Sequence, residues 1–408
     1  MSSRLPFSRA VLGAIIVIAL LAGGFLAYRT LFPPEVKVAV VLDFVGREDL
    51  SFNEMAVLGA DRAAKRFGVK VSIVTPVDLE VFPFVLEEFS KKREYELLIL
   101  VGPLWRDALD KVADKYPQQK FALIAASTGK QRANVLEVLF REQEGAALVG
   151  IAAAGMAREL ATEAGGPVKV GAVAGTSTPP LWRFHIGYLF GAKYFEAKTG
   201  TKVEFAWVYA NKFDDPAAGR RAAEALLAEG TKVLYGVAGK THFGMFDAVI
   251  DWNAQGKGRA LAIGQDTSQE WYNATYIPLS GATRVDVATY KVIEMVVKNE
   301  WRGGVVVLGL AEGGVGIWDL EGVRYFAARA NDYQKTKLLY RNIVEIVIVQ
   351  RVKYLRADVE TLMKELEDRI KRGEIAFKDP RDEGEYEAII RELERGNLNA
   401  ALASGSVS

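Results

Sequence analysis

Short apolar runs alternate with helical patterns along most of the chain, and this alternation restricts the fold more than any other feature. The first run, residues 36–42, is rich in β-branched side chains and follows Pro33 and Pro34, as expected of a buried strand. Strands separated by single helices form parallel sheets with right-handed crossovers. Further strand-like runs cover residues 69–74, 96–101, 120–125, 168–174, 203–209, 232–237, 259–264 and 305–310.

These runs fall into two series joined by a helical pattern over residues 142–161. We therefore predict an α/β protein with two doubly wound parallel-sheet lobes around a cleft. In the expected domain of residues 35–322, the first lobe covers about residues 35–140 plus late return segments. The second lobe covers about residues 141–264. The length of 408 residues allows two cores of this kind.

Residues 323–408 are expected to form a helical extension at the C-terminus. Residues 343–349 are almost wholly apolar, but Glu345 interrupts them and Arg351 and Lys353 follow, so the run is too short for a membrane span. Burial against a lobe is one interpretation of this run, and a surface for a partner is the other.

An uncharged apolar segment, residues 10–28, lies near the N-terminus. As a helix it would be about 28 Å long, close to the hydrocarbon thickness of a bilayer. Arg4 and Arg9 precede it, which favours a cytoplasmic N-terminus and an external remainder. We predict that residues 1–34 form a retained single-pass membrane anchor; the alternative is a cleaved signal peptide. The chain has no cysteine and so no lipid-modified cysteine.

Composition and motifs argue against several classes of function. Lysine and arginine number 52 and aspartate and glutamate 51, for a net charge of +1, so nucleic acid is not an expected partner. His185 and His242 lack acidic or histidine partners at ligand spacing, and we expect them on helix surfaces or at a pocket rim. No GxSxG or HExxH signature occurs. We expect a binding protein without catalytic residues, metal or cofactor.

The first strand-to-helix junction is the clearest candidate for a binding site. The run 36–42 ends at Asp43, and Ser51, Phe52 and Asn53 begin a helical pattern that reaches Phe67. Open α/β sheets bind ligands at the carboxyl ends of their strands, which favours a ligand site here. The alternative is that Ser51 caps the helix and Phe52 belongs to the core.

Several motifs in unbroken order resemble the basic-membrane-protein family of solute receptors, from about Val36 to Leu320. They include VLDFVGREDLSFNEMAVLGA, VGPLWRDALDKVADKYPQQKFALI, TPPLWRFHIGYLFGAKYF and IGQDTSQ. The resemblance implies a type I periplasmic-binding-protein fold. It also implies a receptor that serves the permease and ATPase subunits of an ABC importer, in a family whose characterised branch binds purine nucleosides.

The resemblance also implies which residues bind the ligand. Phe52 and Phe213 match aromatic residues that stack on the base, one from each lobe, and Asp266 matches a carboxylate on the ribose side. Asp214 and Asp215, which follow Phe213, are expected to cap a helix that starts with Pro216. The remaining matched contacts are Asp43, Asn53, Asp107 and Gly239, with Ser51, Trp105, Thr283 and Arg284 as further candidates.

One departure from the family leaves the ligand open. Thr283 stands where the family usually has a lysine, and Arg284 beside it differs from lysine in reach and geometry. A related nucleoside, a free base or another small polar ligand are the alternatives. A second class of function is also open, namely a sensory receptor that signals through residues 323–372.

Overall fold

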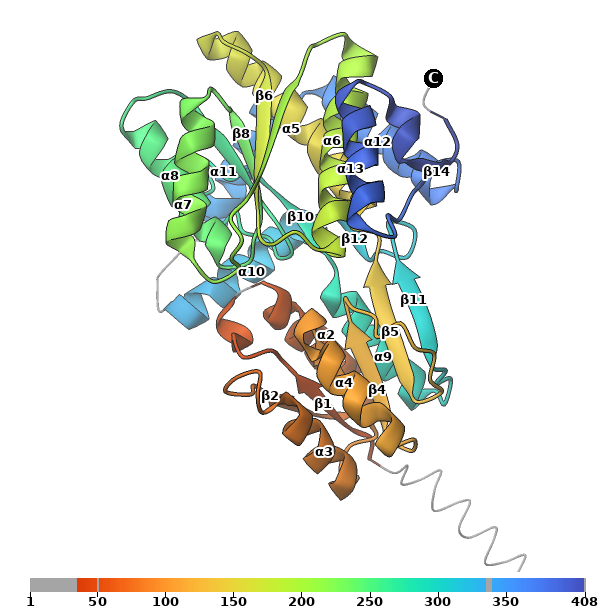
Figure 1. Ribbon diagram of the computed structural model, residues 1–408. Coiled ribbons are helices and arrows are strands. Elements are labelled where there is room, and N and C mark those ends of the chain that lie inside the picture. The colour runs from red at the N-terminus through yellow and green to blue at the C-terminus, as the bar shows by residue number, and fades with distance from the viewer. Residues whose placement is uncertain (1–34, 50, 335–339, 407–408) are drawn as a thin grey trace, which may run out of the picture.

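Two six-stranded sheets form the centres of two lobes (Figure 1). The computed structural model describes residues 35–49, 51–334 and 340–406. The first sheet has the order β11-β5-β4-β3-β1-β2 and the second β12-β10-β9-β8-β6-β7. The strands of the first sheet are β1 (Lys37–Val41), β2 (Lys70–Val74), β3 (Leu97–Val101), β4 (Lys120–Ile124), β5 (Val135–Phe140) and β11 (Gly304–Leu308). Those of the second are β6 (Lys169–Ala174), β7 (Glu204–Tyr209), β8 (Val233–Val237), β9 (Leu261–Gly264), β10 (Leu279–Thr283) and β12 (Val315–Ile317).

Every pairing in these two sheets is parallel except that of β10 with β12, which confirms the predicted parallel α/β architecture. The central strands β1, β3, β4 and β8 are buried almost throughout, because helices cover both faces of a parallel sheet and the strands between them are apolar on both faces. The helices of the first lobe are α2 (Phe52–Phe67), α3 (Phe82–Lys92), α4 (Arg106–Val112) and α9 (Val285–Val297). Those of the second are α5 (Glu142–Ala164), α6 (Pro179–Thr199), α7 (Pro216–Ala228) and α8 (Thr241–Ala254).

The chain passes between the lobes after β5, after β10 and after β11. The second sheet therefore takes in β10 and β12, which lie beyond the expected limit at residue 264. α9 returns to the first lobe and packs on α2, where Gly59 lets the helices approach closely: a Cβ at this position would lie 2.2 Å from the carbonyl oxygen of Asp286. These crossings are the connections expected of a type I binding-protein fold.

α10 (Leu320–Gln334) and α11 (Tyr340–Tyr354) attach the extension to both lobes. In α10, Arg329 donates from Nε to Oε1 of Glu54 in the first lobe, at 2.8 Å. In α11, Arg351 bonds Glu270 of the second lobe at 2.9 Å. Both carboxylates are fully buried, so these ion pairs are internal contacts of the fold.

Part of the apolar run of α11 is buried against the lobes, and part of it is exposed. Ile343, Val344 and Val347 are buried, as expected for burial against the lobes. Ile346 and Val349 remain exposed on the solvent side of the helix, together with Ile348 and Val352. α12 (Ala357–Lys371) and α13 (Glu383–Glu394) then pack on α5 and α6 of the second lobe (Figure 1).

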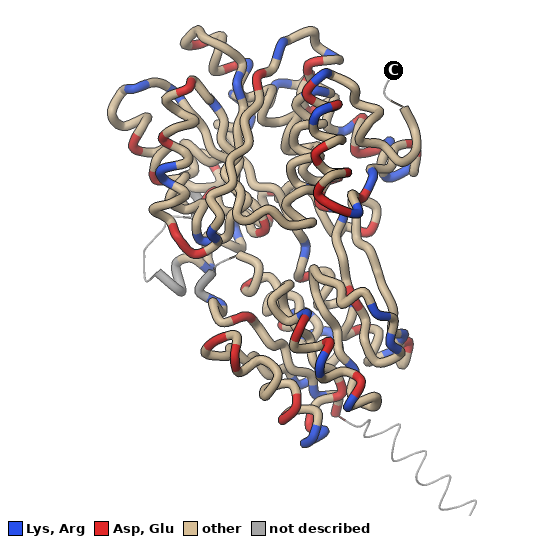
Figure 2. Tube along the Cα trace, in the orientation of Figure 1, with Lys and Arg blue, Asp and Glu red and all other residues tan. Residues whose placement is uncertain are grey.

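Charged side chains of both signs are interspersed over the two lobes (Figure 2). The predicted membrane anchor, residues 10–28, lies outside the described residues. Within residues 35–49, 51–334 and 340–406, no helix has the length and apolar character needed to span a bilayer.

Candidate functional site

The two sheets have the same strand order, and each reverses direction at one point. In the first sheet, β1 lies between β2 and β3; in the second, β6 lies between β7 and β8. Ligands of open α/β sheets bind beside such reversal points, at the carboxyl ends of the strands. Asp43 follows β1, whereas Gly175 follows β6 and Gly239 follows β8. We call the set Asp43, Ser51, Phe52, Asn53, Phe213, Gly239 and Asp266 the interlobe site.

Asp43 and Asn53 form one polar unit on the first lobe. Nδ2 of Asn53 donates to Oδ1 of Asp43 at 2.8 Å, and the backbone N–H of Val45 donates to the same oxygen at 2.9 Å. Burial raises the pKa of Asp43, while these bonds and the positive charge of Lys240 in the second lobe act in the opposite direction. The carboxylate is thus fixed in position at the end of β1.

Two aromatic rings belong to the site, one on each lobe, but their environments differ. Phe52 begins α2 and is partly buried against the core. The Phe213 side chain is 44% exposed. Its ring lies against Gly175, where a Cβ would come within 2.1 Å of the ring carbon Cε1. Gly239, with φ of +54°, passes close to the carbonyl oxygen of Phe213.

Asp215 caps α7 as predicted, because its Oδ1 accepts from the backbone N–H of Ala218 at 3.1 Å. This cap and the turn before it hold Phe213 at the start of the helix. The Asp215 side chain is therefore used for a capping bond to the backbone, whereas the Phe213 side chain remains accessible.

Asp266 connects the lobes directly. Oγ of Ser51 in the first lobe donates to Oδ2 of Asp266 in the second lobe at 3.2 Å. Ser51 makes no side-chain capping bond to α2, so its hydroxyl serves this contact rather than the helix start. Asp266 has φ of +74°, a left-handed conformation that aspartate adopts more readily than most side chains. Burial raises the pKa of Asp266, and hydrogen bonds from Gln265, Thr283 and Ser51 oppose that rise.

Thr283 and Arg284 are both occupied within the second lobe and the hinge. The buried Thr283 hydroxyl accepts from Nε2 of Gln265 at 2.9 Å. Arg284 donates from Nε and Nη2 to the two carboxylate oxygens of Asp286, both at 2.8 Å. The guanidinium also lies over the ring of Trp318, 4.5 Å from its centroid. Arg284 is therefore engaged by Asp286 and Trp318 at the hinge.

Two further candidates make their observed contacts within the first lobe. Trp105 has no exposed area and stacks on Phe82, with ring centroids 3.7 Å apart, so it belongs to the core of the first lobe. The Asp107 side chain is 74% exposed and pairs with its neighbour Arg106 at 2.9 Å. It occupies the first turn of α4, where a negative charge is favoured by the helix dipole.

Gln265 and Lys240 were not among the residues identified from the sequence. Gln265 donates to both Asp266 and Thr283, and it accepts from the hydroxyl of Tyr235. Lys240 directly follows Gly239, and its positive charge opposes the rise that burial causes in the pKa of Asp43. A signal for both existed, because each lies one residue from a predicted site residue at the end of a strand.

The expectation that the two histidines lie at the surface was wrong. His185 and His242 are both buried, and burial lowers the pKa of His185 to about 3 and that of His242 to about 4. Nδ1 of His185 bonds the hydroxyl of Tyr386 from the C-terminal extension at 2.7 Å. Both rings are therefore neutral packing groups. In the described residues, no cluster of histidine, aspartate and glutamate has the arrangement of a metal site.

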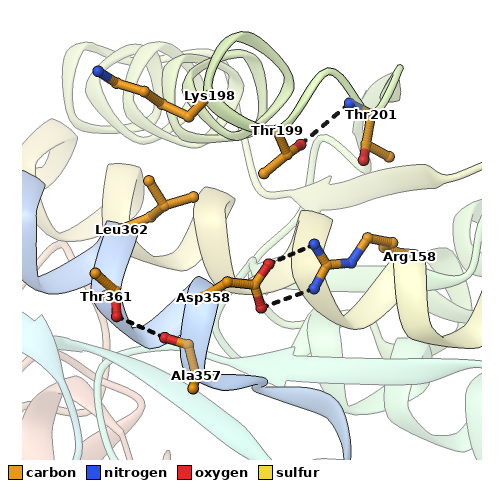
Figure 3. Close-up of a pocket in the computed structure, with 8 residues that line it drawn as sticks. All are labelled: Arg158, Lys198, Thr199, Thr201, Ala357, Asp358, Thr361 and Leu362. Atoms are coloured by element: carbon orange, nitrogen blue, oxygen red, sulfur yellow. Dashed lines mark hydrogen bonds and ion pairs between the residues drawn. The ribbon is translucent and has the colours of Figure 1, made fainter.

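A cavity of about 610 Å³ lies away from the interlobe site, where α5 and α6 end and α12 begins (Figure 3). Arg158 donates to Asp358 across it through two bonds, of 2.6 and 3.1 Å. This ion pair lowers the pKa of Asp358 and raises that of Arg158. This pair thus holds the start of α12 on α5 of the second lobe.

Comparisons with known proteins agree with this geometry. Residues 36–350 match the family model described as ABC transporter substrate-binding protein PnrA-like, a region that includes α10 and most of α11. A crystal structure of ABC transporter system solute-binding proteins from Aeropyrum pernix K1 superposes with a TM-score of 0.84 at 50% identity. The superposition covers 90% of this chain and 100% of the Aeropyrum pernix chain.

Two curated relatives extend the comparison. A Pyrococcus furiosus protein named an uncharacterized lipoprotein is 58% identical over 90% of this chain and 92% of its own length. The ABC transporter nucleoside-binding protein BmpA of Lactococcus lactis is 30% identical over 69% of this chain and 81% of its own length.

Proposed function

Because the chain belongs to the PnrA-like family of ABC transporter substrate-binding proteins, which are binding proteins rather than enzymes, we propose that it captures a purine nucleoside between its lobes and delivers it to an ABC permease. The name of the Lactococcus lactis relative supports a nucleoside as the ligand. The proposed mechanism is reversible binding, with the lobes closing about the segments that cross between them.

The observation that carries this proposal is the half-exposed ring of Phe213 at the reversal point of the second sheet. The ring rests on Gly175 and Gly239, and much of it remains open to solvent. It offers a flat apolar face, which is the complement of a nucleobase. In the proposed complex, Phe52 covers the other face of the base from the first lobe.

The acidic groups on either side of Phe52 suit the polar parts of a nucleoside. Asn53, which follows Phe52, donates a hydrogen bond to Asp43, whereas Ser51, which precedes Phe52, donates one to Asp266. We assign Asp266 to the ribose, whose hydroxyls would take over the place of the Ser51 hydroxyl. In the proposed complex, the sugar replaces the direct contact of Ser51 with Asp266 between the lobes.

Calorimetry on the full-length protein in detergent tests this function. Titration with inosine, guanosine, adenosine, free bases and ribose should give tight binding for nucleosides and no conversion to a base and a sugar. Binding of ribose alone, or of none of these compounds, would refute a nucleoside receptor. Release of free base during the titration would instead point to an enzyme.

We also propose that residues 10–28 anchor the receptor in the cell membrane with both lobes outside the cytoplasm. The Pyrococcus furiosus relative is named a lipoprotein, but this chain contains no cysteine to carry a lipid. An apolar helix supplies the same tether, and tethering raises the effective concentration of the receptor at its permease.

The anchor predicts a fractionation result. The full-length protein should remain in the membrane pellet after alkaline carbonate washing, because a spanning helix is held by the bilayer rather than by charge. A variant that starts at Glu35 should appear in the supernatant. A product in the supernatant whose mass lacks the first residues would favour a cleaved signal peptide, whereas an uncleaved product in the supernatant would refute the anchor.

A further inference from the structure

Lys240 lies at the reversal point of the second sheet, in the turn between β8 and α8. The turn is fixed by its neighbours. A Cβ at Gly239 would lie 3.0 Å from the carbonyl oxygen of Phe213, and the backbone N–H of Thr241 donates to the same oxygen at 3.2 Å. The backbone of this turn therefore runs beside the exposed aromatic ring, and the half-buried Lys240 is placed next to that ring.

Asp43 follows β1 at the corresponding reversal point of the first sheet. Its carboxylate is held there by Asn53, the residue after Phe52, and by the backbone of Val45. Burial raises the pKa of Asp43, and the charge of Lys240 in the other lobe opposes that rise. The two reversal points thus bring a cation beside Phe213 and an anion beside Phe52 to the interlobe site.

Arg284, the other basic candidate near the hinge, is bound to neighbouring side chains. Arg284 is held by two bonds to Asp286 and by the ring of Trp318, while the neutral Thr283 is bonded to Gln265. A charge-assisted bond to a ligand is roughly twice as strong as a neutral one, so the source of the cation affects specificity. Lys240, in the turn beside Phe213, can supply it.

We propose that Lys240 is a specificity-determining residue that, together with Asp43, selects 6-oxopurine nucleosides over adenosine; this assignment rests on the proposed nucleoside-binding function. The ammonium donates to O6 and N7 of the base, as lysine does to guanine in nucleic acids. The Asp43 carboxylate accepts from the neighbouring N1–H. Guanosine and inosine offer this order of acceptor and donor along one edge.

Adenosine offers the reverse order along the same edge. Its 6-amino group would direct hydrogens at the ammonium, and its unprotonated N1 would direct a lone pair at the carboxylate. Turning the base over would correct both contacts but would move the sugar away from Asp266. The two ends of the site therefore discriminate together, since a mismatched buried pair leaves polar groups without partners.

The test compares Lys240→Met with Lys240→Arg and with Lys257→Met, an exposed lysine of the same lobe that lies over Trp252. Full-length proteins are titrated with guanosine, inosine and adenosine, and melting temperatures confirm that each variant is folded. Lys240→Met should lose about 10- to 100-fold in affinity for guanosine and inosine but no more than about 2-fold for adenosine. Lys240→Arg should keep part of the preference, and Lys257→Met should match the unsubstituted protein.

The outcomes separate the two proposals. If the unsubstituted protein binds nucleosides and Lys240→Met leaves all three affinities unchanged, or lowers them equally, the role of Lys240 is refuted while the receptor function stands. If the unsubstituted protein binds no nucleoside, the proposed function fails and this assignment fails with it.

Discussion

Replacing Phe213 by alanine should lower the affinity for nucleosides by about 5- to 100-fold while leaving binding of free ribose within about 2-fold, because stacking on an aromatic ring contributes about 1–3 kcal/mol per base. The Phe213 side chain is 44% exposed, so its removal should cost little folding stability. Calorimetry with inosine and ribose measures the two effects on one protein.

Two comparisons make this prediction specific. Phe84→Ala removes another exposed phenylalanine, 66% accessible on α3 of the first lobe, and should change neither affinity. Gly175→Ala keeps the Phe213 ring but displaces it, since the new Cβ would lie 2.1 Å from a ring carbon. Gly175→Ala should therefore also lower the affinity for nucleosides. Equal losses for inosine and ribose in Phe213→Ala would contradict the stacking role.

Replacing Asp266 by asparagine should have opposite effects on binding and on stability. Loss of the negative charge should lower the affinity for ribosides by about 10- to 100-fold, since a hydrogen bond to a charged group contributes about 1.5–3 kcal/mol. Free bases, which lack the sugar, should be spared. The backbone should tolerate the change because asparagine, like aspartate, adopts the left-handed conformation seen at φ of +74°.

The stability effect follows from the pKa of Asp266, which burial raises above its usual value. A carboxyl group with a raised pKa in the folded state favours folding while it is protonated, and that contribution is lost as the pH rises through the folded-state pKa. At neutral pH the ionised Asp266 is therefore a cost, and Asp266→Asn should raise the melting temperature by about 1–3 °C. The gain should disappear in acid, below the pKa of an unfolded aspartate.

Riboside affinity should also depend on pH. In the unsubstituted protein it should fall on acidification, beginning above the ordinary pKa of an aspartate, because protonation removes the accepting charge of Asp266. In Asp266→Asn this contribution to the pH dependence should be absent. Tight, pH-sensitive riboside binding by the variant would transfer the ribose-binding role to another carboxylate, with Asp43 as the first to examine.

The alternation of apolar runs was enough to predict the parallel sheets, because strand and helix periodicity are properties of neighbouring residues. Residues 36–42, for example, form β1 and its flanks, and the turn after them presents Asp43 as expected. Asp215 as a helix cap was predicted for the same reason, since capping involves only the next few backbone N–H groups.

The sequence could not decide which side chains near those junctions face the other lobe. Trp105 follows a strand end as Lys240 does, yet Trp105 is fully buried against Phe82 whereas Lys240 is half-buried in the turn after Gly239. The buried histidines show the same limit, because their partners, such as Tyr386, are far away in the chain.

The sequence by itself determined the local elements, the order of the two lobes and the residue types at the strand ends. Only the tertiary structure decided that Ser51 meets Asp266, that Arg284 is held by Asp286 and Trp318, and that α10 and α11 join the two lobes. The physical reason is range: periodicity and capping are set within one or two turns of chain. A contact such as that of Ser51 with Asp266 joins residues 215 positions apart and exists only after both sheets have formed and the lobes have met.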